Sequence, residues 1–349
     1  MLDIYAGPVA KQKLQEQGFN PELFSTFLGA SGGPKWFSLY GLDKYLFGEF
    51  FKEKSSSLDL IGSSAGAFRA SCLAQDDPVN AITELAYRYA ETDFTLDASP
   101  QGVTRAAEQL LTQILPHDHM QQVLNNERFK VHFITALCSG AVAQESKLKQ
   151  GIGLTKSLFN NALGRQRLTQ QYQRVVFSTA NAPLKYQEAS VFSTEYVSLD
   201  EQNFHQALLA SGAIPMVMLG IQDIPGAPLG MYRDGGIIDY HFDFKVESEG
   251  LTLYPHFNSK PKAGWFDKNL KRTANAHNYD STVMLVPSDE FIHNLPFNKI
   301  PDRTDFEKLD TSTRIRYWHK VFEETEKLAE SFQEAVDHPT KAVIKDLPF

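Results

Sequence analysis

The chain passes twice from a short apolar run through a glycine-rich turn into a segment with helical character. Residues 24–28 (FSTFL) lead into residues 29–33 (GASGG), and Pro34 then suits the first position of a helix, where its missing N–H costs nothing. Residues 58–61 (LDLI) lead into residues 62–66 (GSSAG) in the same way. Strands that alternate with helices predict a largely parallel sheet covered by helices on both faces.

The alternation continues along the chain. Further strand-like runs cover residues 130–137, 175–178, 231–232 and 283–286, and helical patterns cover residues 34–50, 66–74, 78–92, 102–125, 202–211 and a long closing segment. We find no internal repeat and no low-complexity segment. The pattern indicates an α/β protein.

Composition excludes several classes of protein. Of the 349 residues, 42% are hydrophobic and 22% are charged, which excludes a disordered chain and favours a large core. A net charge of −8 argues against a nucleic-acid partner, and Cys72 and Cys138 alone give neither a disulfide framework nor a cysteine zinc site. No run approaches the roughly 20 apolar residues of a membrane span, and residues 1–18 lack the features of a signal peptide, so we expect a cytoplasmic protein.

The second glycine-rich turn reads Gly62-x-Ser64-x-Gly66. Between a strand and a helix this pattern is typical of a nucleophile elbow, in which small neighbours let a strained turn lift the serine hydroxyl out of the sheet. The following helix places N–H groups and a positive dipole end beside that hydroxyl. The alternative is a serine–glycine turn that only caps a core helix.

The first glycine-rich turn offers backbone N–H groups to an anion. A nucleotide phosphate would require a second glycine and a metal-binding hydroxyl, but Pro34 and Trp36 occupy those positions, so we expect no nucleotide. A developing oxyanion needs only two or three donors, which Gly32 and Gly33 can supply. A tight turn before a helix, with no ligand, is the alternative.

A carboxylate followed by two glycines stands at Asp234-Gly235-Gly236. Placed at the end of a strand, such a carboxylate projects into a crevice with little cover and can act as general base for a serine. The same tripeptide is also common turn chemistry.

In order and spacing, these motifs resemble the patatin-like phospholipase family. The matching stretches are Gly32-Gly33-Pro34-Lys35, Gly62-Ser63-Ser64-Ala65-Gly66, Ala210-Ser211-Gly212-Ala213-Ile214-Pro215 and Asp234-Gly235-Gly236. The resemblance implies a lipid acyl hydrolase that uses a Ser–Asp dyad. It makes Ser64 the nucleophile and Asp234 the base, with Gly32 and Gly33 at the oxyanion hole and Lys35 in support. It implies phospholipid or other lipid-ester substrates, and neither a metal nor an organic cofactor.

The resemblance also implies a three-layer α/β/α fold with a mostly parallel central sheet. It covers residues 22–245, which we expect to be the catalytic domain. Residues 1–21 are expected to form a helical lead-in, and residues 246–349 a C-terminal α/β extension packed on the same domain.

One position departs from the family pattern. Trp36 stands where the glycine loop of the family usually ends in glycine, and its indole could narrow the site or face the core. Two other functions therefore stay open: an acyltransferase that uses the same dyad, and a catalytically silent lipid-binding protein.

A histidine triad is the alternative to a dyad, because an ordinary α/β-hydrolase places its histidine after the acid. Four histidines follow Asp234, namely His241, His256, His277 and His293. None carries a further signature, and we interpret each as a surface or packing residue.

Residues 145–174 are basic within an acidic chain. They contain six cationic residues against one acidic residue: Lys147, Lys149, Lys156, Arg165, Arg167 and Arg174. With Ile152, Leu154, Leu158 and Phe159 as an apolar side, the segment could be a mobile flap that contacts phospholipid headgroups. A solvated helix and loop over the sheet is the alternative interpretation.

Overall fold

The computed structural model of the chain describes residues 1–93, 97–180, 184, 186–188 and 192–349. Within these residues, eleven strands form one mixed sheet. Its main path runs in the order β13 (Ile344–Asp346), β1 (Leu2–Ala6), β12 (Thr282–Pro287), β11 (Leu251–Pro255), β2 (Phe24–Gly29), β3 (Leu58–Ser63), β4 (Phe129–Cys138), β5 (Tyr172–Ser178) and β7 (Thr194–Ser198). Two short strands lie off this path: β9 (Met231–Asp234) pairs with β4, and β8 (Ile221–Gln222) pairs with β9.

The middle of the sheet is parallel. Strands β12, β11, β2, β3 and β4 all run the same way, whereas β1 pairs with β12, and β5 and β9 pair with β4, in the antiparallel sense. Strands β2 and β3 are buried along almost their whole length, as expected of parallel strands covered on both faces. The expectation of a mostly parallel central sheet is confirmed. A separate pair of strands is formed by β6 (Tyr186–Glu188) and β10 (Phe244–Val246).

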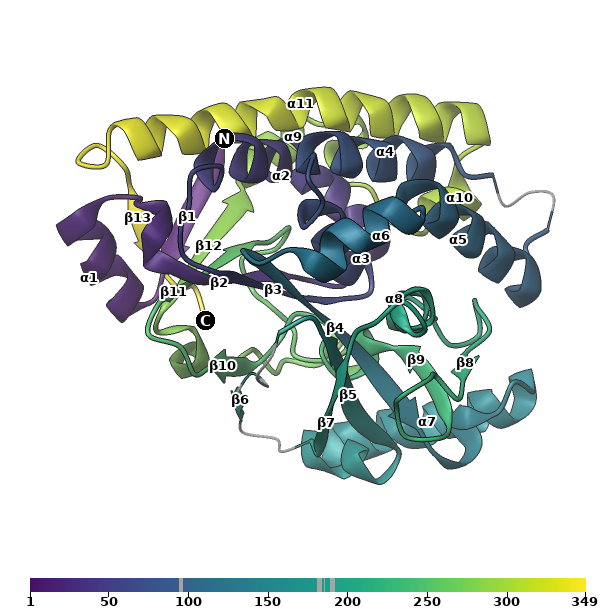
Figure 1. Cartoon of the computed structure of the whole chain (residues 1–349). Helices are drawn as coiled ribbons and strands as arrows, with labels where there is room; N and C mark the ends of the chain where they lie inside the picture. The colour runs from purple at the N-terminus through teal and green to yellow at the C-terminus, as the bar shows by residue number, and fades with distance from the viewer. Residues whose placement is uncertain (94–96, 181–183, 185, 189–191) are drawn as a thin grey trace.

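Helices flank the sheet, in agreement with the expected α/β/α layers. They are α1 (Pro8–Gln17), α2 (Tyr40–Tyr45), α3 (Ala65–Leu73), α4 (Pro78–Glu91), α5 (Pro100–Ile114), α6 (His117–Asn125), α7 (Lys147–Leu163), α8 (Phe204–Ser211), α9 (Asp289–Asn294), α10 (Asp305–Lys308) and α11 (Thr311–Asp337). Figure 1 shows α11, α2 and α4 along one side of the molecule and α7 at the opposite side, below β5 and β7. None of the helices in the described residues has the length and apolar character that crossing a bilayer requires.

Strand β4 changes its neighbour halfway along one edge. Up to Ile134 this edge pairs with β3, whose last residue, Ser63, lies opposite Ile134. From Thr135 onward the same edge pairs with β9, and Asp234 lies opposite Thr135. The ends of β3 and β9 therefore meet at consecutive positions of β4, although they are far apart along the chain.

Three local expectations need correction. Residues 1–21 begin with strand β1 rather than a helix, because Leu2–Ala6 pairs with β12 on one side and β13 on the other; α1 follows it. The helical pattern over residues 102–125 is two helices, since Pro116 has no N–H to continue α5 and stands before α6. The pattern over residues 34–50 is a 3-10 turn, the short α2 and a π-helical turn.

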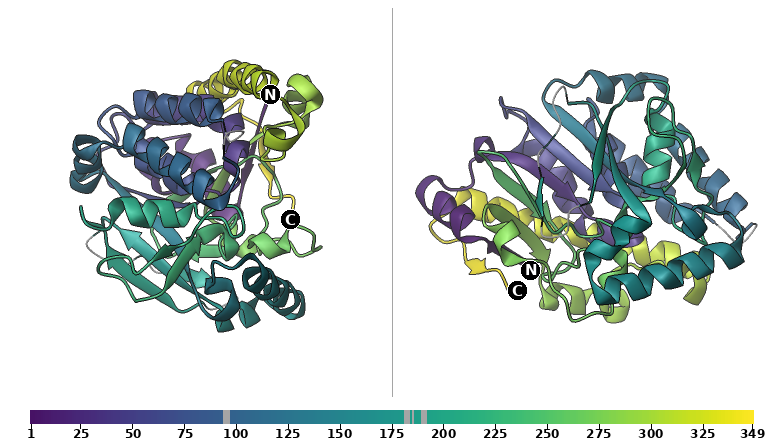
Figure 2. Two further views of the ribbon diagram at one scale, coloured as in Figure 1. Left: turned by 90° about the vertical axis from the view of Figure 1, so that its right-hand side faces the viewer. Right: turned by 90° about the horizontal axis from the view of Figure 1, so that it is seen from below.

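The C-terminal segment is part of the same sheet. Its strands β11 and β12 lie between β1 and β2, and its long helix α11 packs on α2. Figure 2 shows the two chain ends on one side of the molecule, where β1 and β13 are neighbours. Residues 246–349 therefore supply strands to the same sheet as the central part of the chain.

Candidate active site

Ser64 lies in a strained turn between β3 and α3. Its φ of 52° and ψ of −127° belong to a region that residues with a side chain rarely adopt. The Ser64 N–H donates a hydrogen bond to Ser211 Oγ at 3.0 Å, which holds this backbone conformation. The side chain is 5% exposed and points toward Asp234.

The glycines around Ser64 are required by close backbone contacts. A Cβ on Gly66 would lie 1.7 Å from the carbonyl oxygen of Gly29, at the end of β2. A Cβ on Gly62 would lie 2.4 Å from the main chain of Gly66. The first turn of α3 therefore rests directly on the ends of β2 and β3, and no larger residue fits at either position.

Asp234 ends β9 and faces Ser64. The Ser64 hydroxyl donates to Asp234 Oδ2 at 2.8 Å, and the Gly236 N–H donates to Oδ1 at 2.7 Å. Burial raises the pKa of Asp234 above its ordinary value, although these two hydrogen bonds favour the charged form and oppose the rise. Gly235 and Gly236 are also sterically required, because a Cβ on Gly235 would lie 2.1 Å from the Ile134 carbonyl oxygen.

Residues 210–215, one of the stretches on which the family resemblance rests, orient both Ser64 and Asp234. Ser211 accepts the Ser64 N–H and donates its own hydroxyl proton to the Ile134 carbonyl at 2.8 Å. Two residues later, the Ala213 carbonyl accepts the Asp234 N–H at 3.0 Å. The sequence pattern singled out this stretch but assigned no role to Ser211, because its partners lie far away along the chain.

The first glycine-rich turn lies beside the pair. Gly33 has a φ of 55°, which favours glycine, and a Cβ on Gly32 would lie 2.7 Å from the Phe257 ring. Within the described chain, the N–H groups of Gly32 and Gly33 donate to no protein acceptor. Lys35 lines neither of the cavities at Ser64, and its Nζ lies 3.3 Å from Asp302 Oδ2.

Two cavities meet at Ser64. The larger one, about 280 Å³, is mainly apolar and is lined by residues of α3, α4 and α5 together with Met218 and Phe306. Trp36 is buried and is one of the residues that line this cavity, but it does not line the smaller one. The smaller recess, about 30 Å³, is lined by Ser64, Asp234 and other charged or hydroxyl groups together with apolar side chains such as Ile237 and Trp265; we call it the polar recess after its charged groups.

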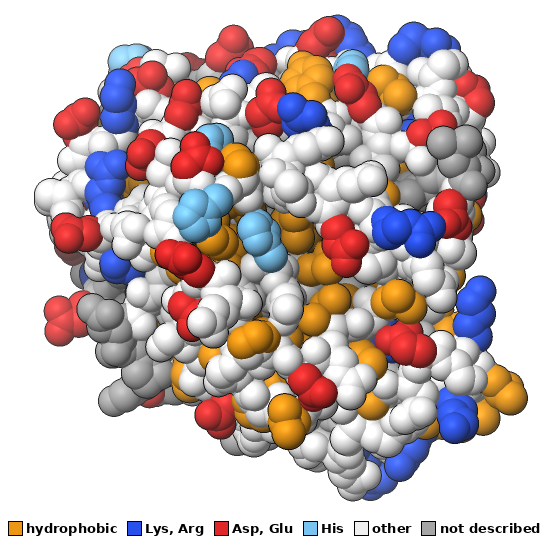
Figure 3. Space-filling model, turned by 45° about the vertical axis from the view of Figure 1, so that its right-hand side comes forward, with side chains coloured by type: hydrophobic (Ala, Val, Ile, Leu, Met, Phe, Trp, Pro, Cys, Tyr) orange, Lys and Arg blue, Asp and Glu red, His pale blue; other side chains and the backbone are white. Residues whose placement is uncertain are grey.

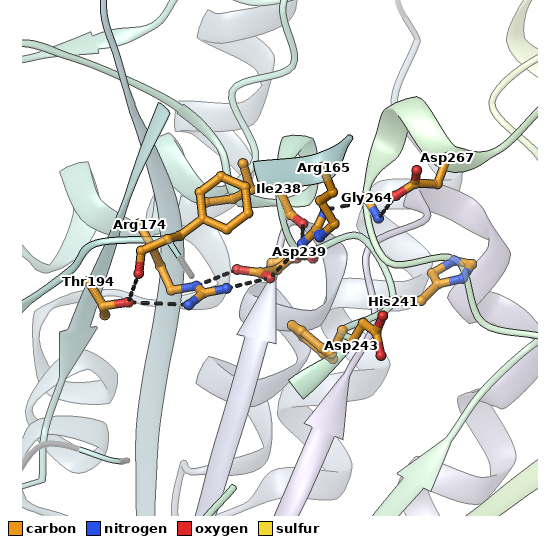
Figure 4. A network of polar contacts seen from close by, with 12 residues as sticks. Arg165, Arg174, Thr194, Ile238, Asp239, His241, Asp243, Gly264 and Asp267 are labelled. Atoms are coloured by element: carbon orange, nitrogen blue, oxygen red, sulfur yellow. Dashed lines mark hydrogen bonds and ion pairs between the residues drawn. The ribbon is translucent and has the colours of Figure 1, made fainter. Parts of the chain in front are cut away.

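A buried ion-pair network fixes the loop that follows Asp234. Arg174 on β5 binds both carboxylate oxygens of Asp239, at 2.6 and 2.9 Å, and Arg165 donates to the Ile238 carbonyl (Figure 4). The Asp239 carbonyl in turn accepts the Ser63 hydroxyl at 2.6 Å. The network thus connects the residue before Ser64 with the loop after Asp234; no sequence signal identified it, because the partners come from separate segments.

No histidine contacts the Ser64–Asp234 pair within the part of the chain that the structure describes. His241 is buried against Tyr240 and His256, with ring centroids 4.2 and 4.4 Å away. Burial lowers the pKa of His241 well below its ordinary value, so its ring stays neutral. This arrangement agrees with the interpretation of His241 and His256 as packing residues.

Comparison with known proteins places the chain in a family. The crystal structure of VipD from Legionella pneumophila aligns with 88% of this chain and 67% of its own, at 14% identity and a TM-score of 0.37. No curated protein matches the sequence significantly. The family model described as patatin-like phospholipase matches residues 60–241, which is more than half of the chain and includes Ser64, Ser211 and Asp234. The chain therefore belongs to the patatin-like phospholipase family.

Proposed function

We propose that the protein hydrolyses acyl esters of lipids, with Ser64 as nucleophile and Asp234 as general base. Family membership supports lipid acyl hydrolysis as the class of reaction. The observation that supports these roles for Ser64 and Asp234 is the 2.8 Å hydrogen bond between Ser64 Oγ and Asp234 Oδ2, which lies where the two cavities meet. A nucleophile and a base within hydrogen-bond reach are the geometry that covalent catalysis needs.

The first half of the reaction acylates Ser64. Asp234 takes the hydroxyl proton as Ser64 Oγ attacks the ester carbonyl, and the tetrahedral oxygen gains a negative charge. The free N–H groups of Gly32 and Gly33, together with that of Ala65 at the start of α3, are the donors available to this charge. As the C–O bond breaks, the leaving alcohol takes the proton from Asp234.

The second half releases the acid. A water molecule gives a proton to Asp234 and attacks the acyl-Ser64 carbonyl, and the Ser64 oxygen recovers the proton as it leaves. Burial of Asp234 assists both halves, since a desolvated carboxylate has a higher affinity for a proton than an ordinary aspartate.

The two cavities differ in what they can accept. The larger, apolar cavity has space for a hydrocarbon chain beside Ser64, whereas the polar recess of about 30 Å³ has space for only a small group. The acyl chain therefore lies among the apolar side chains of α3, α4 and α5, and Trp36 forms one wall of its path.

We further infer that helix α7 binds a membrane surface. Its buried face is made of small or polar residues: Gln150, Gly153, Ser157 and Asn161. Its outer face carries an apolar stripe of Leu148, Ile152, Phe159 and Leu163, which are 76%, 61%, 67% and 69% exposed. At 3.6 residues per turn these four side chains fall within about 60° of one another around the helix.

Charge and position both favour lipid as the partner of this stripe. Lys147 lies on one side of it, and Lys149 and Lys156 on the other, as in helices that lie in a lipid interface. Figure 3 shows lysine or arginine and hydrophobic side chains projecting together at the lower right, where α7 lies. A cavity lined by Lys147 and Met218 adjoins the apolar cavity through Met218, so lipid at α7 lies close to the path of the acyl chain.

Of the two interpretations of this segment, the helix and loop over the sheet agrees with the structure. It is a regular helix and a 3-10 turn packed on the sheet domain, held through Ser157 on Tyr172 and Asn161 on Asp267, rather than a flap. Arg165 and Arg174 are buried with Asp239 and take no part in the exposed surface.

Replacement of either residue of the dyad is expected to abolish hydrolysis without unfolding the protein. Ser64→Ala removes the nucleophile and should lower kcat for a p-nitrophenyl acyl ester by at least about 1,000-fold. Asp234→Asn leaves a side chain that cannot accept the proton, and it should lower kcat by about 100- to 10,000-fold. The matched controls are Ser57→Ala and Asp76→Asn, both at exposed positions. Retained activity in Ser64→Ala, with circular dichroism and thermal unfolding unchanged, would remove the mechanism.

The acid limb of the pH–rate profile should report the ionisation of the Asp234 carboxylate. The ionised carboxylate is the active form, so kcat/KM is present above the folded-state pKa and is lost as pH falls through it. Because burial raises this pKa, the limb should have its midpoint above the value of about 3.9 for an ordinary aspartate. The measurement uses an ester without titratable groups, with tryptophan fluorescence at each pH to monitor folding. A rate that stays constant down to pH ~3.9 is incompatible with a desolvated carboxylate base.

Sedimentation with liposomes tests the α7 surface. The double variant Ile152→Ser/Phe159→Ser should reduce the partition coefficient onto anionic vesicles at least about tenfold, because two large apolar side chains no longer enter the interface. Lys149→Glu/Lys156→Glu should weaken binding to anionic vesicles more than to neutral ones. Val343→Ser is the control, since Val343 is 75% exposed but lies next to β13. Equal partitioning of all variants, or a dimer lost in the serine variant without any vesicle binding, contradicts the membrane assignment.

A further inference from the structure

Two cationic side chains of the C-terminal segment line the polar recess at the dyad. Lys268 follows the 3-10 turn at Trp265–Asp267, and Arg303 precedes α10; both face the recess that contains Ser64 and Asp234. Arg303 also lines the apolar cavity, and a Cβ placed on Gly33 would lie 3.4 Å from its Nη2. Neither residue belongs to the stretch 60–241 that the family model matches.

The loop that carries Lys268 is anchored through a buried carboxylate. Asp267 accepts the Gly264 N–H at 2.9 Å, the Asn161 amide at 2.7 Å and the Arg272 guanidinium at 2.9 Å. The Lys268 ammonium lies over the ring of Tyr240, 4.0 Å from its centroid. Although the residue is exposed, its charged end is thus held at the recess.

The turn that carries Arg303 is anchored in a similar way. The Asp302 N–H donates to Asp305 Oδ2 at 2.8 Å, and the Thr304 N–H donates to Asp302 Oδ1 at 3.0 Å. The Asp302 carboxylate pairs with Lys35 rather than with Arg303. The position of Arg303 is therefore set by backbone contacts on both sides of it.

The two cations have more charge than the protein neutralises. Within the described residues, neither Arg303 nor Lys268 forms an ion pair with a carboxylate. Desolvation lowers the pKa of Lys268 to about 8; repulsion by the charges of Arg303 and Lys35 adds to this shift, and the Asp234 and Asp302 carboxylates oppose it. An anion bound between Arg303 and Lys268 would relieve this repulsion.

We propose that Arg303 and Lys268 form a subsite for a phosphate group of the substrate, at the junction of the apolar cavity and the polar recess. Arginine matches a phosphate with paired donors in one plane, and lysine adds a mobile point charge. This subsite deepens the proposed function and rests on it: the acyl chain enters the apolar cavity, and the phosphate of the same lipid lies near the scissile ester. It also gives residues 246–349 a role in choosing the substrate.

The kinetic test compares two soluble esters with the same short acyl chains, used below their critical micelle concentrations. One is a phosphatidylcholine and the other is the corresponding diacylglycerol, which lacks the phosphate. The double variant Arg303→Gln/Lys268→Gln should lower kcat/KM for the phospholipid at least about tenfold more than for the neutral ester, chiefly through KM, since a hydrogen bond to a charged group contributes about that much. Arg316→Gln/Lys271→Gln, at exposed positions of the same segment, is the matched control. Equal losses on the two esters overturn the subsite, because the cations would then serve the reaction and not the phosphate.

A binding test separates this proposal from the proposed function. In the Ser64→Ala protein the same phosphatidylcholine is not hydrolysed, and its binding is followed through tryptophan fluorescence, since Trp265 lines the recess and Trp36 lines the apolar cavity. Loss of the two cations should raise its Kd at least about tenfold. If the wild type cleaves neither ester but this dependence remains, the hydrolase assignment fails and the phosphate site stands. If inorganic phosphate binds with the same dependence and the phospholipid does not, a free phosphate is the ligand and the headgroup subsite is wrong.

Discussion

The change of neighbour along β4 is the constraint on which the site depends. Ser63 lies opposite Ile134 and Asp234 lies opposite Thr135, so a single strand brings Ser64 and Asp234 together although they are 170 positions apart in the sequence. The Ile134 carbonyl also accepts the Ser211 hydroxyl, which in turn accepts the Ser64 N–H. Both members of the proposed dyad are therefore held by one short stretch of main chain, and a shift of register in β4 would separate them.

Close packing and desolvation give this pair its chemical character. Gly66 and Gly29 let α3 approach the ends of β2 and β3, and this approach creates the strained conformation of Ser64. Asp234 is buried in the same place, so its carboxylate has a higher affinity for a proton than an exposed aspartate. The strained turn at Ser64 and the desolvation of Asp234 thus occur at the same place, as the proposed roles of nucleophile and base require.

Local patterns predicted the parts of the structure that depend on local sequence. The strands before the two glycine-rich turns, the helix after Ser64 and the carboxylate before two glycines follow from short-range chemistry. Strand β1 was not predicted, because Leu2–Ala6 becomes a strand only through β12 and β13, which are distant in sequence. Arg303 and Lys268 belong to no motif, and only the folded chain shows that they face the dyad. The apolar side predicted for this segment was Ile152, Leu154, Leu158 and Phe159, whereas the exposed stripe of α7 is Leu148, Ile152, Phe159 and Leu163, because sequence alone does not tell which side of a helix is buried.

The central claim is that Ser64 is an activated nucleophile and Asp234 is the group that activates it. Labelling with a fluorophosphonate probe, followed by mass spectrometry of the modified peptide, tests this claim most directly, because the probe reacts with activated serines. The account predicts one adduct at Ser64, none in Ser64→Ala, and labelling at least about 100-fold slower in Asp234→Asn. An adduct on another serine, or labelling of Ser64 at an unchanged rate in Asp234→Asn, would contradict it.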